Sequence, residues 1–185
     1  MISIDNNFNF KSNIDHPTST IDFSWYGYSY NSKKIMAISY KPAGFHNVTA
    51  CTRVEDAPGL VAFLKKVFGA TDEGEELRNI KREDGSFHVA EIKIGDTIIM
   101  VFQANQQWQA QPFSVYLYVE NCDETFRKAI GAGAVSLMEP ADMFYGDRNA
   151  GIRDAWGNEW WIATHVEDVP LDQLAQREME VMNKS

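Results

Sequence analysis

Hydrophobic and polar residues follow a regular pattern from Asn47 onward. A strand is predicted over residues 48–54, followed by a helix over residues 58–68 that starts after Glu55-Asp56 and ends at Gly69. Turn signals at Asp84-Gly85 and Gly95-Asp96 then separate three further predicted strands, at residues 76–81, 87–94 and 97–102. This half of the pattern therefore has the order βαβββ.

The same order of elements occurs a second time. In residues 113–119 aliphatic side chains alternate with serine and tyrosine, which predicts a strand with two different faces. A helix over residues 122–130 follows Glu120-Asn121 and ends near Gly131, and three more strands are predicted at residues 135–138, 149–153 and 159–164. Two copies with one order indicate an internal repeat of βαβββ modules, at about residues 45–104 and 112–166.

The flanking segments differ from the repeat. Residues 1–40 are rich in Asn, Ser and aromatic side chains and lack aliphatic periodicity, so we expect an N-terminal arm, with one strand at residues 21–25. The repeat itself lies within a domain over residues 41–168. Residues 169–185 combine spaced apolar side chains with Glu, Gln and Arg, which predicts an amphipathic C-terminal helix.

Composition excludes several classes of protein. The chain of 185 residues has 44% hydrophobic residues, enough for a sizeable core, and a net charge of -9, which disfavours binding to the phosphate backbone of nucleic acids. Cys51 and Cys122 are too few and too far apart for a disulfide framework. No apolar run has the ~20 residues of a membrane span, and the N-terminus lacks the pattern of a secretory signal, so we expect a cytoplasmic protein that does not contact membranes.

Several motifs together resemble one known family. They are Gly44-Phe-His-Asn-Val-Thr49, Phe68-Gly-Ala70, Ala90-Glu-Ile-Lys-Ile-Gly-Asp96, Pro112-Phe-Ser-Val-Tyr-Leu-Tyr-Val-Glu120, Tyr145-Gly-Asp-Arg148 and Trp161-Ile-Ala-Thr-His-Val-Glu-Asp168. The chain resembles the vicinal oxygen chelate superfamily of glyoxalase I, bleomycin-resistance proteins and extradiol dioxygenases, and is most similar to its PhnB-like subgroup. The resemblance implies an α+β fold in which two modules form cupped mixed sheets, and it implies a homodimer with one small-molecule site near the subunit interface.

Metal-dependent members of that superfamily place ligands on the first and last strands of each module. The corresponding residues here are Thr49, Met100, Ser114 and Trp161. A divalent ion needs several convergent His or carboxylate donors, and none of these side chains provides one. We therefore expect neither a metal nor another cofactor.

The same strands predict the lining of a ligand pocket. In residues 113–119 the aliphatic side chains pack on helices and the hydroxyl-bearing ones face the cup. The expected ligand-binding residues are Thr49, Cys51, Met100, Phe102, Ser114, Tyr116, Trp161 and Arg148, with a salt bridge as the alternative role of Arg148. Such a lining suits an uncharged or cationic planar molecule.

Catalytic candidates are few. Glu91 occupies the position of an acidic residue in the family pattern and is the candidate acid or base, with a surface role as the alternative, whereas His88 is turned to the opposite face of its strand. We expect His46 and His165 to be exposed caps. The sequence thus favours a binding protein without chemistry, leaves a glyoxalase-like lyase or isomerase as a second function, and leaves a dimerisation module whose arm recruits a protein as a third.

Overall fold

The computed structural model describes residues 38–74 and 77–183. The chain divides into two units, Met1–Ile38 and Ser39–Ser185, and only the second is described beyond a single residue. The strand predicted at residues 21–25 lies outside the described residues. Among the helices of the described ranges, none is long and apolar enough to span a bilayer.

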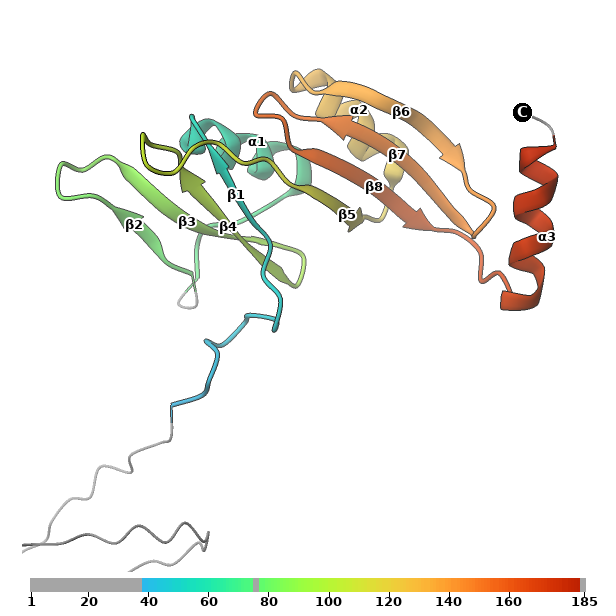
Figure 1. Cartoon of the computed structure of the whole chain (residues 1–185), viewed down its shortest axis with the longest axis horizontal. Helices are drawn as coiled ribbons and strands as arrows, with labels where there is room; N and C mark the ends of the chain where they lie inside the picture. The colour runs from blue at the N-terminus through green and yellow to red at the C-terminus, as the bar shows by residue number, and fades with distance from the viewer. Residues whose placement is uncertain (1–37, 75–76, 184–185) are drawn as a thin grey trace, which may run out of the picture. The chain divides into compact units, whose positions relative to one another are not determined.

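The first module is a four-stranded sheet with a helix on one face (Figure 1). Its elements are β1 (Cys51–Val54), α1 (Ala57–Phe68), β2 (Asn79–Lys81), β3 (Phe87–Ile94) and β4 (Thr97–Gln103). The strand order is β1-β4-β3-β2, with β1 parallel to β4 and the other pairs antiparallel. Cys51 and Glu91 both pair with Met100, from opposite sides, so the three side chains share the face that points away from α1.

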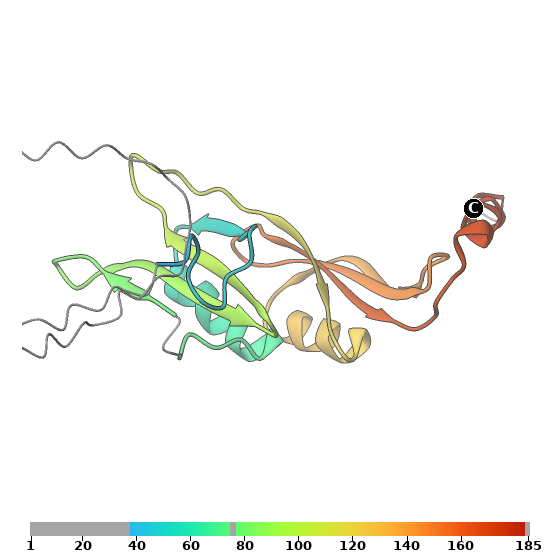
Figure 2. The same cartoon turned by 90° about the horizontal axis from the view of Figure 1, so that it is seen from below.

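The second module repeats this topology. It consists of β5 (Ser114–Tyr118), α2 (Cys122–Gly131), β6 (Val135–Asp142), β7 (Asp147–Arg153) and β8 (Glu159–His165), in the strand order β5-β8-β7-β6. Tyr116 pairs with Trp161, which pairs with Gly151 on its other side. Figure 2 shows α1 and α2 each lying along one face of its own sheet. The predicted α+β fold of two βαβββ modules is confirmed.

Local signals explain where α1 and α2 start and stop. Asp56 accepts a hydrogen bond from the backbone N–H of Gly59 at 3.0 Å, and Asn121 accepts one from Glu124 at 2.9 Å, so both helices have a side-chain N-cap. Helix α1 ends at Gly69, whose φ of 64° lies in the left-handed region that a residue with a Cβ adopts only at a cost.

The two modules share one hydrophobic core. Trp160 of β8 is buried with its ring 4.7 Å from that of Phe68 on α1 and 5.1 Å from that of Phe113. The hydroxyl of Thr52 on β1 donates to the side-chain oxygen of Asn158 at 2.6 Å, which joins the modules through a buried polar contact. Each helix therefore packs on its own sheet, and the sheets are tied together by residues just before and within β8.

Four strands differ from the prediction by two residues or more at one end. Strand β2 starts at Asn79 instead of residue 76. Strand β1 starts at Cys51 instead of residue 48, and Val48 is exposed. Strand β6 continues to Asp142 through Pro140; the proline is tolerated because β6 is an edge strand with register shifts. Strand β7 starts two residues early, at Asp147, because Asp147 still pairs with His165.

The C-terminal helix α3 (Leu171–Met182) packs against no other helix or strand of the described chain. Its link to the module is a pair of hydrogen bonds from the guanidinium of Arg177 to the carboxylate of Glu167, at 2.8 and 2.6 Å. Leu171, Met179 and Met182 are exposed.

Candidate functional site

The second sheet has one face turned away from α2 that carries aromatic and polar side chains. Val115, Leu117, Trp160 and Ile162 belong to the core or pack on it, so their neighbours along the strands point to the other side. We call this other side the open face of the second sheet, and define it by Tyr116, Tyr118, Asp147, Asn149 and Trp161.

Asp147 is the centre of the polar contacts on this face. Its carboxylate is 4% exposed and accepts hydrogen bonds from the hydroxyls of Tyr116 at 3.1 Å and Tyr118 at 2.9 Å. The other carboxylate oxygen lies 2.8 Å from Nδ1 of His165. Three strands, β5, β7 and β8, therefore contribute to one buried anionic group whose oxygens all have partners.

The protonation states within this cluster follow from these contacts. Burial acts to raise the pKa of the Asp147 carboxyl, but hydrogen bonds from His165, Tyr118 and Tyr116 outweigh burial and hold that pKa below its ordinary value. Hydrogen bonds to Asp147 and then to Asp168 raise the pKa of His165. Burial is the main cause that raises the pKa of Tyr116, and the hydrogen bond to Asp147 is the main cause for Tyr118. At neutral pH both tyrosines are therefore hydrogen-bond donors and not bases.

We expect the contribution of His165 to stability to depend on pH. Because the folded pKa of His165 is raised, that contribution is complete below about pH 6.5, its unfolded value, and is lost as the pH rises through the folded value. Asp147 acts in the opposite sense: its stabilisation is present above about pH 3.9 and is lost as the pH falls through its lowered folded pKa. Urea unfolding of the wild type and of His165→Gln should give a difference that shrinks above neutral pH. A difference that stays constant from acid to alkaline pH would contradict this account.

Trp161 provides the aromatic surface beside the cluster. It is half-buried, and its ring lies over Gly151, where a Cβ would come within 2.8 Å of the ring. The absence of a side chain at this position of β7 thus leaves the space that the indole ring needs. On the resulting surface Trp161 lies opposite Tyr116, and Tyr116 and Tyr118 bind the buried carboxylate of Asp147.

An apolar cavity of about 480 Å³ adjoins this surface, between β5 and the turn that joins β3 to β4. Tyr116 and Tyr118 belong to both the cavity and the open face of the second sheet. The cavity is lined by Val48, Ala50, Ile94, Gly95, Asp96, Thr97, Ile99, Val115, Tyr116, Leu117, Tyr118 and Trp160. A volume of this size matches that of a drug-sized ligand site.

The predicted pocket residues fall into two groups. Ser114, Tyr116 and Trp161 lie on the second sheet, on the side away from α2, and Tyr116 is the one of the eight predicted residues that lines the 480 Å³ cavity. Cys51, Met100 and Phe102 lie on the first sheet, on the side away from α1, with Thr49 just before β1. Phe45 is buried there, with the guanidinium of Arg78 5.8 Å from its ring.

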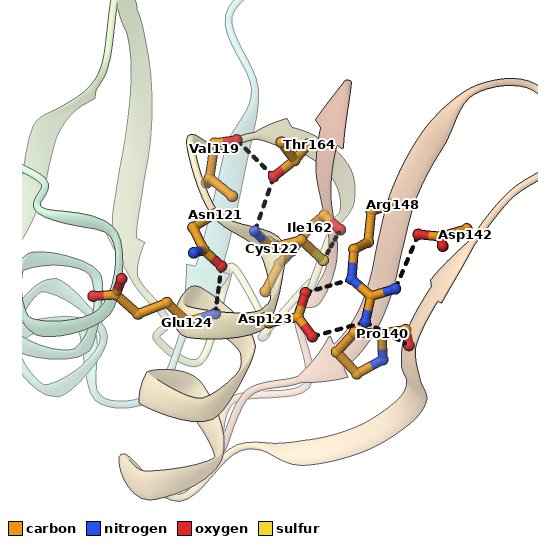
Figure 3. A network of polar contacts seen from close by, with 10 residues as sticks. All are labelled: Val119, Asn121, Cys122, Asp123, Glu124, Pro140, Asp142, Arg148, Ile162 and Thr164. Carbon is orange, nitrogen blue, oxygen red and sulfur yellow. Dashed lines mark hydrogen bonds and ion pairs between the residues drawn. The ribbon is translucent and has the colours of Figure 1, made fainter. Parts of the chain in front are cut away.

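Arg148 does not lie with the other predicted pocket residues. It pairs with Thr164, whose hydroxyl accepts from the backbone N–H of Cys122, so it points to the α2 side of the sheet (Figure 3). Its guanidinium binds both carboxylate oxygens of Asp123 and one of Asp142, and these contacts raise the pKa of Arg148. The structure thus shows the salt bridge that was the alternative role of this residue.

Glu91 is buried, and its carboxylate is hydrogen-bonded to Arg78 through both oxygens. One oxygen accepts the backbone N–H of Arg78 at 2.9 Å, and the other accepts Nε of the same residue at 2.7 Å. Glu91 also raises the pKa of Arg78 through this contact. A carboxylate with both oxygens bound has a structural role that explains its position without catalysis.

The register shows which residues lie opposite two of the positions expected for metal ligands. Cys51 pairs with Met100 and Tyr116 pairs with Trp161, so Thr49 and Ser114 lie two residues earlier in the chain than these partners. Neither the expected positions nor these partners provide the His and carboxylate donors that a divalent ion requires. Within residues 38–74 and 77–183, no three His, Cys, Asp or Glu side chains are grouped to hold a metal ion.

Four residues of the site were not among the eight expected ligand-binding residues: Tyr118, Asp147, Asn149 and His165. The sequence contained a usable signal, since Asp147, Asn149 and Gly151 are spaced by two and therefore share a face of the strand. The predicted role of His165 as an exposed cap holds only in part: its side chain is 52% exposed, but it binds Asp147 and Asp168.

Comparisons with known proteins agree with this architecture. The family model described as Glyoxalase/Bleomycin resistance protein/Dioxygenase superfamily matches residues 45–162. An uncharacterised protein of Mycobacterium bovis is 27% identical over 150 residues, covering 75% of this chain and 93% of its own length. Among solved structures, TioX from Micromonospora sp. ML1 is 23% identical with a TM-score of 0.51, covering 64% of this chain and 99% of its own. A PhnB protein from Bacillus cereus is 17% identical with a TM-score of 0.50, over 64% and 99% of the two chains. The chain belongs to the glyoxalase/bleomycin resistance protein/dioxygenase superfamily.

Proposed function

We propose that this protein binds a planar aromatic molecule, uncharged or cationic, on the open face of the second sheet and does so without a metal. The observation that carries the proposal is a pair of tyrosines bound to buried Asp147, with Trp161 opposite Tyr116 on the neighbouring strand, next to an apolar cavity. Aromatic rings stack on planar ligands and attract cations through their faces. The net charge of -9 adds a long-range attraction for cations.

The proposal includes a homodimer. Within the described chain, the outer edge of β5 is unpaired and that of β1 pairs only at Arg53, with Gln111; exposed Val48 and Tyr118 lie next to the cavity between these strands. Unpaired edges and an apolar cavity are surfaces that a second copy covers. Light scattering on the sample used for binding tests this part, because the mass of a single 21.0 kDa chain would contradict it.

A lyase or isomerase acting through Glu91 has less support. The carboxylate of Glu91 is engaged by Arg78, and the two tyrosines of the site stay protonated at neutral pH. Neither group is therefore placed to remove a proton from a substrate.

The experiment is a fluorescence titration with proflavine, a planar cation, and with neutral acridine and anionic 9-anthracenecarboxylate as controls of similar shape. The anion is titrated against Arg53→Gln, which lacks the positive charge beside Trp108. We expect proflavine and acridine to bind more tightly than the anion. Trp161→Ala should weaken proflavine binding by about tenfold, because the main stacking surface is lost. Trp108→Ala, an exposed tryptophan on the loop between the modules, is the matched control and should leave the affinity unchanged.

The same titration separates metal-free from metal-dependent binding. Treatment with EDTA should change neither the affinity nor the number of sites. Binding that EDTA abolishes and zinc or manganese restores would overturn the metal-free part of the proposal. An affinity that is equal in the wild type and in Trp161→Ala would overturn the location of the site.

A further inference from the structure

A second hollow lies at the end of the first sheet, apart from the open face of the second sheet. It has a volume of about 200 Å³ and is formed where β1 and β4 end, β3 begins and the loop between the modules starts. Its lining consists of Arg53, His88, Phe102, Gln103, Asn105 and Trp108. The combination of two basic side chains with two aromatic ones distinguishes this hollow from the largely apolar cavity described above.

The loop holds Trp108 in a fixed position at the rim. The side-chain oxygen of Asn105 accepts the backbone N–H groups of Gln107 at 2.9 Å and Trp108 at 2.8 Å, and the N–H of Asn105 donates to the carbonyl of Trp108 at 2.9 Å. These three bonds close a tight turn. The indole is nevertheless 56% exposed, so a rigid loop presents a large aromatic surface to solvent.

The guanidinium of Arg53 lies against this indole. Its guanidinium carbon is 5.3 Å from the centre of the Trp108 ring, and Nη1 donates to the carbonyl of Gln109 at 3.2 Å. The backbone of Arg53 is fixed on both sides, by β4 and by two hydrogen bonds with Gln111.

Four arginines of the described chain, Arg78, Arg148, Arg153 and Arg177, each pair with a carboxylate, whereas Arg82 and Arg127 show no such pair among the described residues. No such pair is found for Arg53 within the described residues, although Glu55 lines the neighbouring hollow.

We propose that this hollow binds a small planar carboxylate, such as an aromatic or heteroaromatic acid. The free edge of the Arg53 guanidinium matches the two oxygens of a carboxylate, which is the geometry that makes arginine pairs with carboxylates specific. Trp108 and Phe102 supply the aromatic walls for the ring of the ligand, and His88 adds a hydrogen-bonding group. Stacking of the guanidinium on Trp108 keeps that edge oriented without an ion pair to hold it.

The test uses benzoate as the probe and benzamide as its uncharged counterpart. Two-dimensional ¹H–¹⁵N spectra of the full chain resolve the indole N–H signals of its five tryptophans, and Trp108→Phe identifies the signal of Trp108. We expect benzoate to shift that signal with a dissociation constant in the millimolar range or tighter, as is usual for a ligand of about nine heavy atoms. Benzamide should bind at least about tenfold more weakly, because it lacks the charge that Arg53 neutralises.

Variants locate the interaction. Arg53→Gln should weaken benzoate binding by about tenfold or more. Arg53→Lys should also weaken it, because lysine keeps the positive charge but lacks the paired N–H donors of the planar guanidinium. Arg153→Gln, an exposed arginine on the second sheet, is the matched control and should bind benzoate like the wild type. The spectra show at the same time whether each variant is folded.

Three results would overturn the proposal. Benzoate that leaves the Trp108 signal unmoved at millimolar concentration excludes the site. Equal binding of benzoate and benzamide excludes recognition of the carboxylate. Equal binding by Arg53→Gln and the wild type excludes Arg53. None of these results bears on proflavine binding at Trp161, since the two sites use different residues on different sheets.

Discussion

Replacing Asp154 with alanine is expected to lower the free energy of unfolding by about 3–5 kcal/mol. Asp154 is 5% exposed and lies just before β8. One carboxylate oxygen accepts the backbone N–H groups of Trp156 at 3.0 Å and Asn158 at 2.9 Å. The other accepts the side chains of Asn158 at 2.8 Å and Trp160 at 3.0 Å. Alanine leaves these four donors without an acceptor, and it frees Asn158, the residue that joins the modules through Thr52.

Asparagine at this position is not a conservative replacement. Its amide has a single oxygen, so one of the two pairs of donors always faces an NH₂ group. Urea unfolding measures both variants, with Asp172→Ala on exposed α3 as the control, for which a change within about 0.5 kcal/mol is expected. A loss of less than about 1 kcal/mol for Asp154→Ala would show that this cluster does not hold the modules together.

The second large effect is expected for Gly146→Ala, at about 2–4 kcal/mol. The φ of Gly146 is +98°, and a Cβ there would collide with the backbone carbonyl oxygen of Glu167. The carbonyl of Gly146 also accepts the N–H groups of Val166 at 2.9 Å and Glu167 at 3.0 Å. An alanine therefore combines backbone strain with the displacement of the segment after β8, which carries Asp168 and the link to α3.

Gly85→Ala separates these two causes. Gly85 also has a positive φ, of +80°, but a Cβ there would meet no atom within 4 Å. Its substitution should cost only about 1 kcal/mol, which is the strain alone. Urea unfolding together with amide exchange of Val166 and Glu167 compares the variants. Equal losses for the two glycines would show that the close approach to Glu167 has no energetic weight.

The order and type of the elements could be predicted because each depends on residues that are close together in the sequence. Residues 113–119 alternate in polarity, and Asp56, Asn121 and Gly69 provide the helix boundaries, so these elements follow from a few neighbouring side chains. The repeat then made the second module predictable from the first. The same argument explains the missed limits of β1 and β6: strand ends depend on pairing with distant residues, which polarity does not encode.

The site was harder to predict because it depends on register between strands. Asp147 meets Tyr116, Tyr118 and His165, which lie far away in the sequence but side by side across β5, β8 and β7. A difference of one position separates Asp147, on the open face of the second sheet, from Arg148, which binds Asp123 on the α2 side. Arg148 therefore lies on the opposite face from the other expected pocket residues of the second sheet, which spacing along the sequence alone did not reveal.

The crystal structure of the complex with proflavine tests the central claim most directly. The account predicts density for the dye on the open face of the second sheet, stacked on Trp161 and in contact with Tyr116, above the carboxylate of Asp147, with no metal ion beside it. Density for the dye only elsewhere on the molecule, or a dye held through a bound metal ion, would contradict it.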